Sequence, residues 1–294
     1  MKCLSPRRIT KNLDPTKFPD GLLVPCGQCM HCRLLIREQW TMRIIHESQS
    51  WDSCIFFTLT YDNDNLPENG SLCKPDLQKF FKRIRKYIGG KPIKYFACGE
   101  YGENTNRPHY HVIMFGLDYL YDRKTIKDCW HYCDWSSLGR SPFGDVCQQS
   151  IRYVVGYIEK TVLGLEAADE YGNRQKPFHL VSKGIGRAYA IKNKSNFELD
   201  GKCIVQGQKR DLPRYYTTIT GLLRDNIKER AAIQEAEAVE AVLGIKLTRD
   251  ELYHSGTVDD ILKLEDLVQE SAIQNDVNLK AKIAIKRRRS NKGM

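Results

Sequence analysis

Residues 108–115 read Pro-His-Tyr-His-Val-Ile-Met-Phe, and the apolar second half of this run is typical of a buried β-strand. Successive side chains of a strand point to opposite faces, so His109 and His111 share one face and Tyr110 lies on the other. Two imidazoles that converge from one rigid strand supply two ligands of a metal site, and a nearby carboxylate can complete it. The stretch therefore predicts a central strand and a candidate metal site.

A second strand is predicted at residues 92–98, and it brings Glu100 to its end. A turn region rich in Gly and Asn follows, and strands so close in the sequence commonly pair in antiparallel fashion. In that pairing Glu100 returns level with His109 and His111. We therefore expect Glu100 to be the carboxylate of the site.

The neighbouring segments place these strands in an α+β fold. Residues 54–61 have the aromatic and β-branched composition of a strand, and residues 33–47 have a helical pattern. Residues 75–88 carry apolar side chains at helical spacing, with a proline at the start and two glycines directly after the end. The order strand, helix, strand, strand favours an antiparallel sheet with helices on one side, whereas residues 117–149 and 164–176 are predicted to be mostly loop.

Three cysteines stand near the start of the chain at C-x-x-C-x-x-C spacing: Cys26, Cys29 and Cys32. Thiolates on such a knuckle converge on one tetrahedral Zn²⁺, which needs a fourth ligand. Cys3 is the nearest remaining thiol, and His31 is a local substitute. We favour a structural zinc site; three reduced cysteines near a helix start and an iron–sulfur cluster are the alternatives.

Composition and charge indicate the class of partner. The chain has 294 residues, of which 41% are hydrophobic, as expected of a globular protein with a real core. The net charge is +10, and the excess lies before residue 221, which favours a polyanion such as nucleic acid. No run approaches the roughly 18 apolar residues of a membrane span, and the N terminus lacks the apolar core of a secretion signal. We therefore expect a soluble protein with no membrane partner and with reduced or metal-bound cysteines.

Residues 149–162 predict a helix that carries two tyrosines. Tyr153 and Tyr157 are four residues apart and share a face, and Lys160 lies one turn away. Such a pair is usually packing, and it becomes a candidate site only beside a metal. A tyrosine hydroxyl has a pKa of about 10 in water, but a divalent cation and Lys160 would stabilise its phenolate. In-line attack on a DNA phosphodiester would then give a 5′-phosphotyrosine and a free 3′-OH.

Together these features resemble a known family. Residues 108–112 are similar to the HUH motif (His, apolar residue, His) of rolling-circle replication initiators, and Tyr153-x-x-x-Tyr157 resembles their two-tyrosine form. With the strand at residues 56–61, the cysteine knuckle and residues 214–216, the set resembles the replication initiators of the Microviridae, in particular those of gokushovirus-like phages. The resemblance spans residues 1–216.

The resemblance implies a central antiparallel sheet, the palm of HUH and RRM-like folds, with flanking helices. It implies an endonuclease that nicks and rejoins single-stranded DNA at a phage origin through a 5′-phosphotyrosine intermediate. The implied partners are origin DNA and the replication helicase and polymerase of the host, and the implied place of action is the cytoplasm of the infected bacterium.

The resemblance also assigns roles to residues. It implies a Mg²⁺ or Mn²⁺ ion held by the ligands His109, His111 and Glu100, with the nucleophiles Tyr153 and Tyr157. Relatives often carry a lysine between the tyrosines, where this chain has Gly156, so Lys160 must supply the cation if one is needed. Tyr110 fills the middle of the motif, where aliphatic residues are frequent, and this leaves the ligand geometry unchanged.

We expect three segments along the chain. Residues 1–50 hold the zinc knuckle and a helix, residues 51–220 form the endonuclease domain, and residues 221–294 form a charged extension. The extension is predicted to contain helices at 225–242 and 259–279 and to end in a basic tail. The candidate DNA-contact residues are Arg152, Lys183, Arg187, Arg210 and Arg214.

The alternative function is that of a non-catalytic, zinc-stabilised DNA-binding protein. Such a protein would use the same basic surface and the cysteine knuckle. It would need neither the tyrosine pair nor two converging histidines, and these residues therefore favour the enzyme.

Overall fold

A computed structural model describes residues 3–222 except residues 4, 12, 17–18, 104, 137, 139–140 and 162–165. The helices predicted at residues 225–242 and 259–279 and the basic tail lie outside the described residues. The chain divides into two compact units, one of residues 1–32 with 221–294 and one of residues 33–220. In the first unit, the described residues include a two-stranded antiparallel sheet of β1 (Arg7–Ile9) and β2 (Leu22–Val24).

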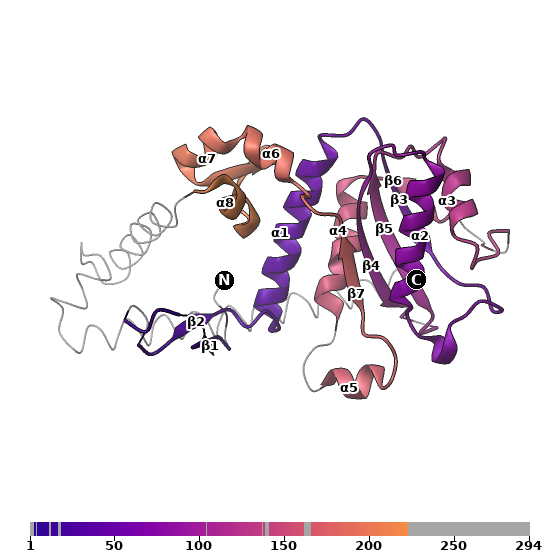
Figure 1. The fold of residues 1–294 in the computed structure, drawn as a ribbon, viewed down its shortest axis with the longest axis horizontal. Helices are drawn as coiled ribbons and strands as arrows, with labels where there is room; N and C mark the ends of the chain where they lie inside the picture. Colours follow the sequence, from indigo (N-terminus) through magenta and orange to yellow (C-terminus); the bar gives the residue numbers. More distant parts are fainter. Residues whose placement is uncertain are drawn as a thin grey trace, which may run out of the picture. The chain divides into compact units, whose positions relative to one another are not determined.

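A five-stranded antiparallel sheet forms the centre of the unit of residues 33–220 (Figure 1). Its strands, in spatial order, are β6 (Phe143–Asp145), β3 (Cys54–Leu59), β5 (Pro108–Phe115), β4 (Lys94–Tyr101) and β7 (Phe178–Val181). The predicted stretch is thus the middle strand, β5. The predictions of an α+β fold and of an antiparallel pair of strands are confirmed.

Helices cover both faces of this sheet (Figure 1). On one face lie α2 (Lys74–Tyr87) and α3 (Arg123–Cys129), and on the other lie α1 (Met30–Ser48) and α4 (Gln148–Lys160). The expectation of helices on one side is therefore wrong.

The physical reason for two helical layers lies in β5, which buries the side chains of both of its faces. Tyr110 and Val112 belong to the core under α2, whereas Ile113 and Phe115 belong to the core under α1 and α4. A strand that is apolar on both faces needs a covering layer on each.

Short elements complete the described part of the chain. They are a 3₁₀ turn (Glu68–Gly70), α5 (Glu166–Tyr171), α6 (Arg187–Lys192), α7 (Lys194–Asp200), the hairpin of β8 (Lys202–Val205) and β9 (Gln208–Asp211), and α8 (Arg214–Thr220). The segments predicted to be mostly loop contain α3, β6 and α5, which are too short to show a clear sequence period. None of the described helices has the length and apolar composition to cross a membrane.

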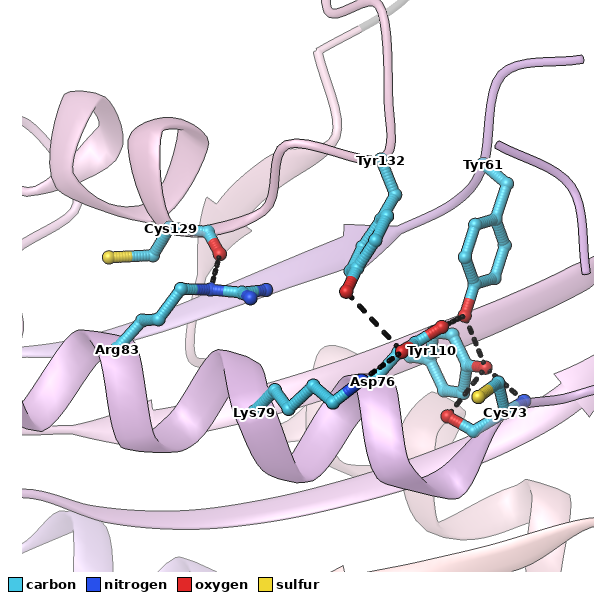
Figure 2. A network of polar contacts seen from close by, with 8 residues as sticks. All are labelled: Tyr61, Cys73, Asp76, Lys79, Arg83, Tyr110, Cys129 and Tyr132. Atoms are coloured by element: carbon cyan, nitrogen blue, oxygen red, sulfur yellow. Dashed lines mark hydrogen bonds and ion pairs between the residues drawn. The ribbon is translucent and has the colours of Figure 1, made fainter. Parts of the chain in front are cut away.

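A polar network under α2 holds Tyr110 in place (Figure 2). The Tyr110 hydroxyl accepts a hydrogen bond from the Cys73 backbone N–H (2.7 Å) and lies 3.0 Å from the Tyr61 hydroxyl. Tyr61 and Tyr132 both donate to the Asp76 carboxylate, at 3.2 and 3.3 Å. Because Cys73 and Asp76 stand at the start of α2, the network ties this helix to the middle strand.

A second contact in the same view joins α2 to α3. The Arg83 side chain donates from Nε to the Cys129 carbonyl at 2.7 Å, and this carbonyl is at the C-terminal end of α3 (Figure 2). A cation at the end of a helix satisfies a carbonyl that has no partner within the helix. Both helices on this face are therefore held by directed contacts as well as by apolar packing.

The network predicts the effect of removing one hydroxyl. Tyr110→Phe leaves the Cys73 N–H as a buried donor without its partner, which should lower the free energy of unfolding by about 1–3 kcal/mol. Urea denaturation followed by circular dichroism measures this decrease. The matched control is Tyr121→Phe, since Tyr121 is 83% exposed; an equal, small effect of both changes would contradict the role of Tyr110.

Candidate active site

His109, His111 and Glu100 share one face of the sheet. Glu100 of β4 stands opposite His109 of β5 in the strand register, and its Oε1 lies 3.0 Å from His111 Nε2. The two imidazole rings are nearly parallel, with centroids 6.4 Å apart. On the β3 side, Thr58 Oγ1 lies 2.9 Å from His111 Nδ1. Neighbouring strands thus bring together the three side chains singled out in the sequence.

His109 is held in a way that suits a metal ligand. Burial lowers the pKa of His109, and the Glu100 carboxylate opposes this only in part, so the imidazole is neutral at neutral pH. Its Nδ1 is buried and has no hydrogen-bond partner in the described part of the chain. The ring packs on Gly102, where an added Cβ would lie 3.0 Å from the imidazole Cε1. A larger residue at position 102 would push the ring out of place.

The donor set fits a divalent cation such as Mn²⁺ or Mg²⁺. Two imidazoles and one carboxylate leave room in the coordination sphere for oxygen ligands. The Thr58 hydroxyl at Nδ1 fixes the His111 ring and directs Nε2 toward Glu100, which is how a supporting side chain commonly orients a ligating histidine. A bound ion would take the place of the hydrogen bond between His111 and Glu100.

The helix α4 carries both tyrosines to this site. The Tyr157 ring stacks on His111, with centroids 4.7 Å apart and planes 3° from parallel, and Tyr153 meets the same imidazole at 5.1 Å and 78°. Tyr153 is 49% exposed, whereas Tyr157 is 8% exposed. Burial raises the pKa of Tyr157, and the neighbouring Tyr153 and Glu100 raise it further. Of the two hydroxyl-bearing rings, only that of Tyr153 is open to solvent.

Contacts at the middle and the end of α4 fix its position. Its apolar side buries Val154 against the sheet, and the Val154 carbonyl accepts a hydrogen bond from the Cys98 thiol at 3.3 Å. At the C-terminal end, Arg33 Nη1 donates to the carbonyls of Glu159 (2.8 Å) and Thr161 (2.6 Å). These carbonyls have no partner within the helix, so the guanidinium closes the end of α4.

Lys160 and Gly156 lie on the same helix as the tyrosines. Lys160 Nζ is 5.1 Å from the centre of the Tyr157 ring and 2.6 Å from Glu103 Oε1. Both partners of that ion pair are largely exposed, so it holds the lysine only weakly. An added Cβ at Gly156 would meet no atom within 4 Å, so a side chain would fit there.

In the unit that contains the N terminus, four cysteines form a cluster. The sulfur atoms of Cys3, Cys26, Cys29 and Cys32 all lie within 4.8 Å of one another. Cys3 Sγ is 3.8 Å from Cys29 Sγ, and Cys26 Sγ is 4.0 Å from Cys32 Sγ. Four thiols at this spacing could hold one tetrahedral Zn²⁺. Of the two candidates for the fourth ligand, the structure places Cys3 in the cluster and leaves His31 outside it.

The backbone prepares this cluster for a metal. The N–H of Cys29 donates to Cys26 Sγ at 3.2 Å and that of Gln28 at 3.4 Å. These bonds, the Cys29 bond foremost, lower the pKa of Cys26 to about 6, so the thiolate that binds metals is present at neutral pH. Gly27 has a φ of 73°, the left-handed conformation that the tight turn of the knuckle requires.

The basic residues proposed to contact DNA do not form one patch. Lys183 and Arg187 line the same recess. Arg152 is exposed on α4 next to Tyr153, and Arg210 of β9 and Arg214 of α8 are exposed outside that recess.

Sequence reasoning did not single out three residues that support the site: Thr58, Gly102 and Arg33. Thr58 could have been found, because it stands in the strand that pairs with β5 and falls on the same face as His111. The roles of Gly102 and Arg33 depend on contacts with the His109 ring and the end of α4, which leave no sequence signal.

Comparison with known proteins identifies the family. The family model for replication-associated protein ORF2 matches residues 54–162, which include the histidines, Glu100 and both tyrosines. Replication-associated protein VP4 of Bdellovibrio phage phiMH2K is 30% identical over 236 residues, which cover 72% of this chain and 70% of that protein. The chain belongs to the replication-associated proteins of the Microviridae. The family named on sequence motifs alone is thus confirmed.

Two further relatives of this replication-associated protein share the description. Replication-associated protein ORF2 of Spiroplasma virus 4 is 34% identical over 218 residues, 66% of each chain. Replication-associated protein ORF4 of Chlamydia phage 1 is 25% identical over 228 residues, 70% of this chain and 55% of that protein. The matched segment therefore spans between 55% and 70% of the relatives' own lengths. No solved structure matches the chain significantly.

The cysteine cluster predicts a metal content that can be measured. The purified replication-associated protein should contain one zinc ion per chain, and Cys29→Ser should lose most of it because a hydroxyl is a poor zinc ligand. Elemental analysis gives the stoichiometry. The matched control is Cys147→Ser, an exposed cysteine outside the cluster. Equal zinc in both variants, or none in the wild type, would contradict a zinc site.

Proposed function

We propose that this replication-associated protein initiates phage DNA replication by nicking and rejoining single-stranded DNA at the origin. The observation that carries the proposal is the contact of both tyrosine rings with His111, whose Nε2 faces the Glu100 carboxylate. A nucleophile and a set of metal ligands thus meet on one face of one sheet. The descriptions of three phage relatives as replication-associated proteins support the same role.

The proposed reaction is a transfer of the DNA phosphoryl group to a tyrosine. The Tyr153 oxygen attacks the scissile phosphorus and loses its proton to water, the bond from phosphorus to the 3′ oxygen breaks, and that oxygen takes up a proton as the free 3′-OH. A divalent cation on His109, His111 and Glu100 would neutralise charge on the phosphate oxygens. The product is a 5′-phosphotyrosine, and attack by a 3′-OH reverses the step and rejoins the strand.

The two tyrosines have different roles in this proposal. Tyr153 makes the first cut, because its ring is open to solvent and an incoming strand can reach it. Tyr157 is stacked on His111, and burial raises its pKa and keeps its hydroxyl protonated. It orients the imidazole first and becomes a nucleophile when the occupied Tyr153 moves away. Lys160, beside the Tyr157 ring, would then stabilise its phenolate.

The chemistry also implies partners. A free 3′-OH at the nick is a primer, so a polymerase of the host is the enzyme that uses the product. A helicase must separate the strand that remains attached through its 5′ end. The proposal therefore places the protein in the cytoplasm of an infected bacterium, on origin DNA.

The proposal predicts which tyrosine change prevents covalent attachment. With single-stranded origin DNA and Mn²⁺ or Mg²⁺, the wild type should form an adduct visible on a denaturing gel. Tyr153→Phe should reduce the initial rate of adduct formation at least about 100-fold, since the nucleophile is removed. Tyr157→Phe should retain the first cut, and the double variant should form no adduct. Tyr121→Phe, an exposed tyrosine of another region, is the matched control.

Two outcomes would overturn this proposal. An adduct that persists in the double variant would show that another residue is the nucleophile. Absence of an adduct with either ion, while the DNA is still bound, would favour the non-catalytic DNA-binding protein.

Thr58 offers a test of the metal site that does not depend on cleavage. Thr58→Val keeps the shape of the side chain but removes the oxygen beside His111 Nδ1, so the affinity for Mn²⁺ should fall roughly 10- to 100-fold. Titration calorimetry measures this affinity. Thr218→Val, an exposed change on α8, is the control. Equal affinities of the two variants would show that Thr58 does not position a ligand.

A further inference from the structure

A recess in the unit of residues 33–220 is not explained by the cleavage chemistry. It has a volume of about 550 Å³, and its lining comes from α1, from the turn between β7 and α6, and from α8. The lining residues used below are Trp40, Arg43, Lys183, Gly184, Arg187 and Tyr215. Three of these side chains are cationic and two are aromatic. A recess of this volume is large enough for a small organic ligand.

Arg43 is held rigidly in the recess. Its guanidinium lies between two aromatic rings, 3.9 Å from the centre of Trp40 and 3.8 Å from that of Tyr215. Its Nε donates to the Ile185 carbonyl at 3.1 Å. A guanidinium fixed in this way presents its remaining N–H groups in one direction and loses little freedom when it binds an anion.

The positive charge of the recess is not offset by acidic side chains. In the part of the chain that the structure describes, no carboxylate lies within ion-pair distance of Arg43, Lys183 or Arg187. The buried carboxylate of Glu47, one turn from Arg43 on α1, is instead 2.7 Å from Lys94. Burial lowers the pKa of Arg43, which shows that its charge is costly there. An anionic ligand would offset this cost.

The turn that carries two of the cations is built for close packing. Gly184 and Gly186 have φ values of 78° and 77°, which other residues rarely adopt. An added Cβ at Gly186 would lie 2.5 Å from the Tyr216 hydroxyl, and the Gly186 N–H donates to Glu47 at 2.7 Å. The turn is thus fixed against α1 and α8, so the recess is formed before any ligand arrives.

The recess and the candidate active site share one face of the sheet. Val181, which lines the recess, stands opposite Phe96 of β4, and Phe96 precedes Glu100 by four residues. At about 3.3 Å per residue of strand, the two places are about 13 Å apart along β4. An extended nucleic acid strand of a few nucleotides could span that distance.

We propose that this recess binds one unpaired nucleotide of the single-stranded DNA, a few nucleotides from the cleavage site. The phosphate would contact Arg43, Lys183 and Arg187, and the base would stack on the partly exposed rings of Trp40 and Tyr215. Aromatic side chains among cations are how proteins hold single strands, whereas a duplex offers no free base face. The inference rests on the proposed function for the identity of the ligand, and it adds an anchor that positions the strand.

Binding without cleavage tests this inference on the full-length protein. The probe is a fluorescent single-stranded oligonucleotide in EDTA, followed by anisotropy over a range of salt concentrations. The double variant Lys183→Gln, Arg187→Gln should bind at least about 10-fold more weakly, and the slope of log affinity against log salt should fall by about 0.7 for each phosphate that the variant no longer binds. Tyr215→Leu should weaken binding of the single strand more than binding of a duplex of the same sequence.

The control must remove the same charge elsewhere. Lys82→Gln with Lys86→Gln does so on the exposed side of α2, which covers the opposite face of the sheet. Equal decreases in affinity for the two double variants would contradict the recess as a site and leave only general attraction between a basic protein and DNA. Equal effects of Tyr215→Leu on single strand and duplex would contradict base stacking.

The outcome can be separated from that of the cleavage assay. If the recess variant loses binding as predicted but the wild type forms no covalent adduct, the nucleotide site stands and the proposed enzymatic function is wrong. If the adduct forms and the recess variant binds like the control, the enzymatic function stands and the nucleotide site is wrong.

Discussion

The alternation of side chains along β5 is the constraint on which the rest of the structure depends. Tyr110 is fixed under α2 by hydrogen bonds to Cys73 and by its contact with Tyr61. Because neighbouring residues of a strand point to opposite faces, this contact forces His109 and His111 to the face covered by α4. A slip of the register by one residue would bury the imidazoles under α2 and remove the candidate site, so the packing of an aromatic residue on one face protects the chemistry on the other.

The α4 face combines a rigid support with one accessible group. His111 is held on three sides, by Thr58, by Glu100 and by the stacked ring of Tyr157. Tyr153 contacts the same imidazole but stays half exposed. A site of this kind needs little rearrangement when DNA arrives, because the ligands and the nucleophile already stand next to one another. The recess around Arg43 follows the same principle, since its central cation is fixed by stacking before a ligand binds.

Local patterns in the sequence predicted the parts of the site that depend on spacing alone. The two histidines share a strand face, the tyrosines share a helix face, and the cysteine knuckle needs only a short turn; Glu100 followed from antiparallel pairing of adjacent strands. The second layer of helices was missed, because an apolar run does not reveal how many of its faces are covered. The recess was missed because Trp40, Arg43 and Tyr215 are brought together only by tertiary packing. Lys183 and Arg187 were selected for their charge, and only the structure shows that they line one recess.

The central claim is that the histidines of β5 and the tyrosines of α4 form a single active site in which Tyr153 attacks DNA. Mass spectrometry of the covalent adduct tests this claim most directly. Trypsin should cut after Arg152 and after Lys160, and the released peptide, residues 153–160, contains both tyrosines and no other. We expect the nucleotide mass on this peptide, at Tyr153 after a single cut, and only when a divalent cation is present. Attachment to any peptide outside residues 153–160 would contradict the claim.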